Sequence, residues 1–146
     1  SRKRQSSERQ AVVVLSDGND TRSIVGFEDV LDLARNTDVS IYTIFLRGTD
    51  EDLKKNKYFQ AKYVLEKLTT ETGGVSYAPA RIKDLAGVYD LIAAELKSQY
   101  NLGYTSTNEA QDGSWRRIQV VCERSGLEVR TRTGYYSRRS RGEARP

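Results

Sequence analysis

The sequence has no histidine, no methionine and a single cysteine, and these gaps exclude whole classes of chemistry. Without histidine, the side chain that most often acts as a general base near neutral pH is missing, so Ser-His-Asp and Cys-His catalysis are excluded. Zinc sites of the usual kind are excluded for the same reason. The lone Cys122 rules out an internal disulfide, and its place in an alternating row predicts a small buried residue. Any bound metal must therefore be a hard cation with oxygen ligands.

Long apolar runs are absent as well, because nothing approaches the roughly 18 consecutive residues of a membrane-spanning helix. No signal peptide is visible. At 146 residues, with 37% hydrophobic and 30% charged residues, the chain fits one globular domain or part of one. Because it starts without methionine, we expect it to be a processed product or a piece of a longer chain.

Positive charge is concentrated at the two ends of the chain. Residues 1–10 are rich in Arg, Ser and Gln, and residues 116–146 contain nine Arg against three Glu. The middle of the chain is mildly acidic. We therefore expect residues 1–10 to form a basic N-terminal tail and residues 137–146 to form a basic, disordered C-terminal tail.

Residues 11–100 alternate between strand and helix patterns. Apolar runs at residues 11–15 and 39–46 predict strands buried on both faces, and residues 75–78 predict a third, weaker strand before Pro79. Helical spacing of apolar residues lies between these strands, and a Gly pair at 73–74 ends the second helix. The apolar positions expected on the helices are Phe27, Val30, Leu31 and Ala34, then Ala61, Val64, Leu65 and Leu68, and finally Ile82, Leu85, Ala86, Tyr89, Ile92, Ala93, Leu96 and Tyr100.

This order of elements predicts an α/β fold, a Rossmann-like three-layer α/β/α arrangement with a parallel sheet. Residues 101–136 differ, because apolar and polar residues alternate at 102–104, 115–122 and 127–133, with turn signals at 112–113 and 125–126. We expect an antiparallel β meander that extends the same domain.

The first strand runs directly into Ser16, Asp17, Gly18, Asn19 and Asp20. The carboxyl edge of a parallel sheet is where such folds place their ligand sites, and carboxylate, hydroxyl and amide oxygens suit Mg²⁺ or Ca²⁺. A simpler interpretation is a loop that caps the following helix. A third is the Asp-Gly-x-Asn-Asp loop of haloacid dehalogenase-type phosphatases, although the spacing here is one residue short and no Asp-x-Asp strand precedes it.

Several segments together resemble a von Willebrand factor A domain, in particular the bacterial VWFA-related family. AVVVLSDG at 11–18 resembles the fourth strand and third metal loop, and IYTI at 41–44 resembles the fifth strand. LTTETGG followed by VSY at 68–77 resembles a helix and the sixth strand. The C-terminal LKSQYNLGYTSTN, DGSWRRIQVVC and GLEVRTRTGYY are similar to the end of these proteins. The resemblance covers nearly the whole chain.

The resemblance implies a non-enzymatic protein-binding module with a metal-ion-dependent adhesion site, and an extracytoplasmic location. In the family, three loops hold the cation, which completes its shell with an acidic side chain of the protein ligand. Only Asp17 has a counterpart here, so the chain resembles the C-terminal half of such a domain, truncated on its N-terminal side. We expect Mg²⁺, Ca²⁺ or Mn²⁺ in the intact domain and none bound by this chain alone. The strand at 11–15 would then be an unpaired apolar edge, open to self-association.

The C-terminal strands offer another candidate site. Arg116, Arg117, Arg130 and Arg132 lie among aromatic residues, a combination that can stack bases and contact phosphates. The simpler interpretation is a solvated strand face whose Arg stems cover apolar neighbours. We therefore favour protein binding over nucleic-acid binding.

Overall fold

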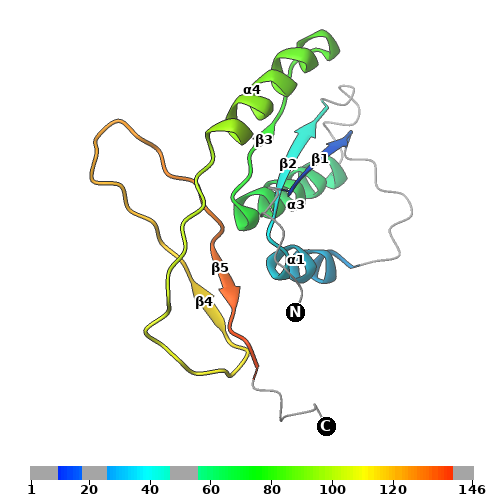
Figure 1. The fold of residues 1–146 in the computed structure, drawn as a ribbon. Helices are drawn as coiled ribbons and strands as arrows, with labels where there is room; N and C mark the ends of the chain where they lie inside the picture. Colours follow the sequence, from blue (N-terminus) through cyan, green and yellow to red (C-terminus); the bar gives the residue numbers. More distant parts are fainter. Residues whose placement is uncertain (1–9, 18–25, 47–55, 140–146) are drawn as a thin grey trace, which may run out of the picture.

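The computed structural model describes residues 10–17, 26–46 and 56–139, and shows a mixed α/β fold (Figure 1). A parallel sheet with its helices forms one part, and a small antiparallel hairpin forms the other. The elements in chain order are β1 (Gln10–Ser16), α1 (Phe27–Asn36), β2 (Val39–Phe45), α3 (Asn56–Thr72), β3 (Ser76–Tyr77), the 3₁₀ turn η1 (Ile82–Asp84), α4 (Leu85–Ser98), β4 (Trp115–Arg117) and β5 (Gly134–Tyr136).

The parallel sheet has the order β1-β2-β3, so β2 is its central strand. β1 pairs with β2 over its whole length, with Val13 opposite Tyr42, and the two-residue β3 pairs with β2 near its end, with Thr43 opposite Ser76. Runs of β-branched and aromatic residues explain both long strands. The expected strands and their parallel pairing are confirmed. The predicted burial of the first strand on both faces is wrong, because β1 lies at the edge of the sheet and leaves Val12, Val13 and Leu15 exposed.

Two apolar clusters cover opposite faces of β2. Tyr42 and Ile44 point to one face and pack with Val88 and Ile92 of α4. The alternate residue Ile41 belongs to the other face, where Leu31 and Ala34 of α1 meet Leu68 of α3. Side chains alternate between faces along a strand, which is why one seven-residue strand can hold helices on both sides.

The buried stripe of α4 differs from the one predicted. Leu85, Val88, Ile92 and Leu96 face the sheet, whereas Ile82, Tyr89 and Tyr100 are exposed and Val88 was not on the predicted stripe. The reason is that residues 82–84 form a 3₁₀ turn and the α-helix begins only at Leu85. The helix has apolar residues on two flanks, and periodicity alone does not decide which flank packs.

We expect Ile92→Ala to lower the free energy of unfolding by about 2–5 kcal/mol, because it opens a cavity in the core. Tyr89→Ala on the exposed flank is the matched control and should change it by less than about 0.5 kcal/mol. The side chains are 3% and 47% exposed, respectively. Urea denaturation followed by circular dichroism measures both, and equal losses would contradict the observed stripe.

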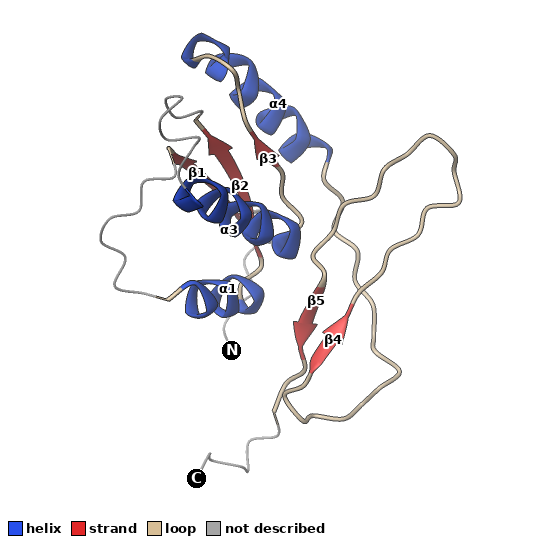
Figure 2. Ribbon diagram, turned by 180° about the vertical axis from the view of Figure 1, so that it is seen from behind, coloured by secondary structure: helices blue, strands red, loops and turns tan. Residues whose placement is uncertain are grey.

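The C-terminal part forms a hairpin smaller than the predicted meander. Only β4 and β5 pair, with Arg116 opposite Tyr135, and an isolated bridge joins Asp112 to Arg139 (Figure 2). The strands expected at 102–104 and 127–133 are wrong, since no strand is assigned there. The pairing instead continues into residues 137–139, which we expected in the disordered tail. Because β4 ends at Arg117, the chain beyond it is uncovered, and Cys122 is exposed and not buried as predicted.

β1 lies at the edge of the sheet, and its outer side pairs with no described strand. Three of its side chains stay exposed, Val12 at 48%, Val13 at 39% and Leu15 at 48%. The strand has no charged residue and no proline, the usual protections of a natural edge. An apolar edge strand whose outer side pairs with no described strand is suited to pairing with a further strand.

We expect the chain to self-associate in a concentration-dependent way through β1. Val13→Lys should reduce the association, because a charge on an edge strand opposes pairing. Leu33→Lys, on the exposed flank of α1, is the control and should leave it unchanged. Sedimentation velocity over a range of concentrations measures the effect. A chain that stays monomeric throughout, or equal effects of the two substitutions, would contradict it.

Candidate functional site

Asp17 immediately follows β1 at the carboxyl edge of the parallel sheet, where the sequence analysis placed it. The backbone there is fixed by the neighbouring strand, because the Leu46 amide donates a 2.8 Å hydrogen bond to the Ser16 carbonyl. At the same edge, the rings of Phe45 and Tyr58 pack edge to face, 4.8 Å apart. The Asp17 residue is exposed. Three further candidates, Gly18, Asn19 and Asp20, lie outside the described residues.

The cation site implied by the resemblance needs several carboxylate or hydroxyl ligands within about 2.5 Å of one ion. Across residues 10–17, 26–46 and 56–139, no three acidic, His or Cys side chains come together in such a group. Of the ligand candidates singled out from the sequence, Ser16 and Asp17 are the two that the described part of the chain places at this edge. These two residues could supply part of the ligand set of a cation, and they do not form a complete site.

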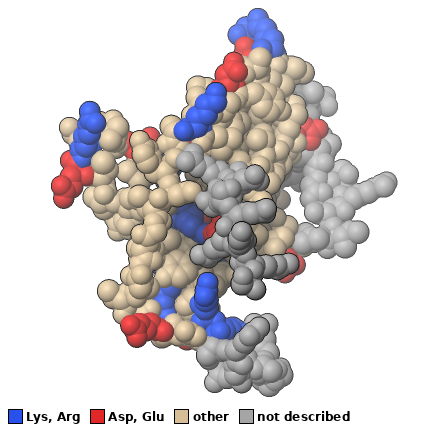
Figure 3. Space-filling model, viewed as in Figure 1, with Lys and Arg blue, Asp and Glu red and all other residues tan. Residues whose placement is uncertain are grey.

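The predicted basic surface is engaged with carboxylates of the same chain. Arg116 pairs with Asp112 at 3.1 Å, and Arg130 pairs with Glu95 at 2.9 Å. The third, Arg132, lies 2.6 Å from Asp38. Figure 3 shows blue and red side chains interspersed over the described residues of that face, with no single basic surface. Arg117, the fourth candidate, is exposed on β4.

We expect little binding to single-stranded nucleic acid, because phosphates would have to displace these carboxylates. Fluorescence anisotropy with a labelled single-stranded oligonucleotide at low and high salt measures it. Arg117→Gln should have no larger effect than Arg81→Gln, an exposed Arg on η1's N-terminal side. Tight, salt-dependent binding that Arg117→Gln weakens would instead favour the nucleic-acid hypothesis.

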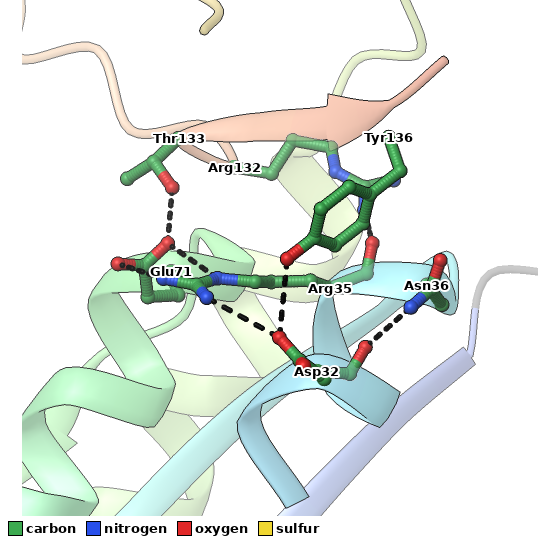
Figure 4. Close-up of polar contacts among 7 residues, drawn as sticks. All are labelled: Asp32, Arg35, Asn36, Glu71, Arg132, Thr133 and Tyr136. Carbon is green, nitrogen blue, oxygen red and sulfur yellow. Dashed lines mark hydrogen bonds and ion pairs between the residues drawn. The ribbon is translucent and has the colours of Figure 1, made fainter. Parts of the chain in front are cut away.

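A cluster of polar side chains lies at the opposite end of the sheet from Asp17, where α1 and α3 end (Figure 4). Arg35 contacts both carboxylate oxygens of Glu71, with Nη2 at 3.2 Å from Oε1 and Nε at 3.4 Å from Oε2. The Thr133 hydroxyl donates to the same Glu71 carboxylate, and the Thr133 amide donates to the Glu71 carbonyl at 3.3 Å. The last turn of each helix therefore meets the segment before β5.

β5 and the segment before it make further contacts at the end of α1. The Tyr136 hydroxyl donates to Asp32 at 3.1 Å, and Arg132 donates to the carbonyls of Arg35 and Thr37. Arg35 also lies over the ring of Trp115, with its guanidinium carbon 5.0 Å from the ring centroid. Cations at a helix C-terminus interact favourably with its carbonyls, which explains why Arg35 and Arg132 gather there.

Electrostatics of this cluster favour the ionised form of Glu71. Partial burial raises the pKa of Glu71, but hydrogen bonds from Thr133 and Arg35, with the charges of Arg35 and Lys67, outweigh it and hold the pKa below its ordinary value. Because the folded pKa is depressed, Glu71 stabilises the folded arrangement above its unfolded pKa. This contribution is lost as the pH falls through the folded value.

A second polar contact joins α4 to the C-terminal part. The buried Tyr42 of β2 donates to Glu95 at 3.1 Å and accepts from Gln99 at 3.0 Å, and Glu95 in turn pairs with Arg130. Burial raises the pKa of Tyr42 to about 12, and the nearby Glu95 charge adds to this effect. Tyr42 is therefore a neutral hydrogen-bonding residue of the core.

Sequence reasoning missed Asp32, Arg35, Glu71, Thr133 and Tyr136 as a group. These residues come from three separate segments, and each alone matches an ordinary exposed position. The only available signal was a basic residue in the last turn of a helix, which is too common to predict a cluster. Arg132 was singled out as basic surface, and the structure assigns it to this cluster.

Comparisons with known proteins show no family. No family model matches the chain, and no curated protein sequence matches it. Among solved structures, it is similar to the crystal structure of an uncharacterized membrane spanning protein from Vibrio fischeri, with a TM-score of 0.45 and 24% identity. The match covers 60% of this chain and 47% of that one, so the chain spans about half the length of its structural neighbour. A likeness at this level carries no argument about function.

Within the described residues, no helix combines the length and the apolar composition needed to cross a membrane.

Proposed function

We propose that the chain is part of a protein-binding module of the von Willebrand factor A type and has no enzymatic activity. In this proposal Asp17 is one ligand of a divalent cation, and the remaining ligands come from groups outside the described residues. When bound, the cation would bridge the module to an acidic side chain of a protein partner. Mg²⁺, Ca²⁺ or Mn²⁺ suits such an oxygen-ligand site. The family resemblance also underlies our proposal of an extracytoplasmic location.

A Rossmann-like three-layer α/β/α arrangement is part of the same proposal. Its support is the placement of α4 on one face of the sheet and of α1 and α3 on the other. Short connections between parallel strands favour right-handed crossovers, which place helices on both faces in this way. In the order β1-β2-β3, β1 is an edge strand, as the resemblance implies for a domain truncated on its N-terminal side.

The observation that carries the proposal is the position of Asp17 at the carboxyl end of an edge strand with an open side. A further strand beside β1 would cover Val12, Val13 and Leu15 and would end at the same sheet edge as Asp17. Ligands from two neighbouring strands would then converge there, as in open α/β sheets generally. Asp17 on β1 alone cannot enclose a hydrated cation.

We expect this chain alone to bind Mg²⁺ weakly or not at all, because a single strand end supplies too few ligands. Isothermal titration calorimetry with MgCl₂ measures it, on the native chain, on Asp17→Ala and on the control Asp90→Ala from the exposed side of α4. None of the three proteins should show a binding heat at micromolar Mg²⁺ concentrations. Micromolar binding that only Asp17→Ala removes would overturn the shared-site proposal.

The strand paired with β1 in a longer chain distinguishes this proposal from the phosphatase hypothesis. An Asp-x-Ser-x-Ser motif at its end supports the adhesion-type site. An Asp-x-Asp motif would supply the nucleophile of a haloacid dehalogenase-type phosphatase and would overturn the proposal. A chain that spans both strands should lose its cation-dependent protein binding on Asp17→Ala and should not hydrolyse p-nitrophenyl phosphate.

A further inference from the structure

The C-terminal segment, residues 99–139, is attached to the α/β part in a different way from every other element. Both apolar clusters consist of residues up to Leu96, and no residue between 99 and 139 belongs to either. Its attachments to the α/β part include the polar contacts of Arg130, Arg132, Thr133 and Tyr136, together with the stacking of Trp115 on Arg35. We call this segment the strap.

The strap nevertheless follows the α/β part closely. The strap backbone at Thr131 passes so near the end of α3 that a Cβ on Gly73 would come 2.8 Å from the Thr131 carbonyl carbon. Within the strap, Trp115 packs edge to face on Tyr136 at 4.9 Å, so the hairpin has a small core of its own. These features describe a unit that holds together internally and docks through a polar interface.

We propose that the strap is a clasp that undocks as a unit in acid, when Glu71 is protonated, while the parallel sheet and its helices stay folded. Local opening of this kind is expected where few buried apolar contacts join a segment to the rest. This proposal is independent of the cation proposal, because the contacts of the strap with α1 and α3 lie at the opposite end of the sheet from Asp17, which follows β1 (Figure 1).

The cations and the hydrogen-bond donor that face Glu71 all favour its ionised form. Arg35 approaches from α1, Lys67 lies one turn earlier on α3, and Thr133 donates from the strap. Asp32 faces Arg35 and Tyr136, and Asp38 faces Arg132 (Figure 4 shows all but Lys67 and Asp38). Glu95 pairs with Arg130 and Asp112 with Arg116. Protonation of Glu71 removes the charge that pairs with Arg35 and the carboxylate that accepts from the Thr133 hydroxyl.

Trp115 makes the undocking measurable, because it is the only tryptophan in the chain and lies on Arg35. We expect its emission to shift to longer wavelength only as the pH falls below about 4, because the pKa of Glu71 is held below the ordinary value of a glutamate carboxyl. Far-UV circular dichroism of the helices should persist to lower pH. If the two signals change together, or Trp115 emission stays constant until the helices unfold, the proposal is wrong.

Two substitutions and a control sharpen the measurement. Thr133→Val removes one hydroxyl donor to Glu71 at similar volume, and it should move the midpoint of the Trp115 transition toward neutral pH. Arg35→Gln should give the emission of the released form already at neutral pH, with helical circular dichroism retained. Arg81→Gln removes an exposed ion pair with Asp84 and should leave the midpoint unchanged. A Thr133→Val midpoint equal to that of the control would overturn the proposal even if Arg35→Gln fails to fold.

Discussion

The rest of the structure depends on β2, which pairs with a strand on each side and is buried on both faces. Its neighbours β1 and β3 pair with no other described strand, and both apolar clusters are built on its two faces. Tyr42, Thr43 and Ile44 are completely buried, which makes this strand the most enclosed part of the described chain. Even its polar atoms are paired, since the Thr43 hydroxyl donates to Ser76 at 2.9 Å. Burial of an unpaired hydroxyl would cost about 1–3 kcal/mol.

The two ends of β2 lead to different kinds of chemistry. At its carboxyl end, the neighbouring β1 delivers Asp17 to an exposed edge, where a ligand can approach. At its amino end, the last turns of α1 and α3 present Arg35 and Glu71, which are already paired with each other and with the strap. Glu71 therefore has a structural role, since its carboxylate joins the ends of two helices to the strap.

The sequence was informative where local pattern and tertiary packing agree. The apolar runs at 11–15 and 39–46 correspond to β1 and β2, and neither strand has a polar face. The apolar spacing around Leu31 and Leu68 corresponds to α1 and α3, and each helix has one clear apolar face. It was misleading for α4, where two apolar flanks compete, and for residues 102–104 and 127–133, where alternation occurs without a partner strand. Alternation describes which way side chains point, but a strand also needs a backbone to pair with.

For the candidate site as well, prediction succeeded where the contacts are local in sequence and failed where they join distant segments. Asp17 could be predicted because a strand end fixes its place through contacts local in sequence. The contact between Glu71 and Thr133 joins residues 62 positions apart, and no local pattern encodes it. Of the basic residues expected on strands, Arg116 and Arg117 lie on β4, whereas Arg130 and Arg132 lie outside the strands. Their acidic partners could not be predicted, because a salt bridge depends on which acid the fold brings near. Arg130 and Arg132 pair with Glu95 and Asp38 from elements far earlier in the chain. The charge that made this segment resemble a nucleic-acid surface is therefore the charge that attaches it to the sheet and its helices.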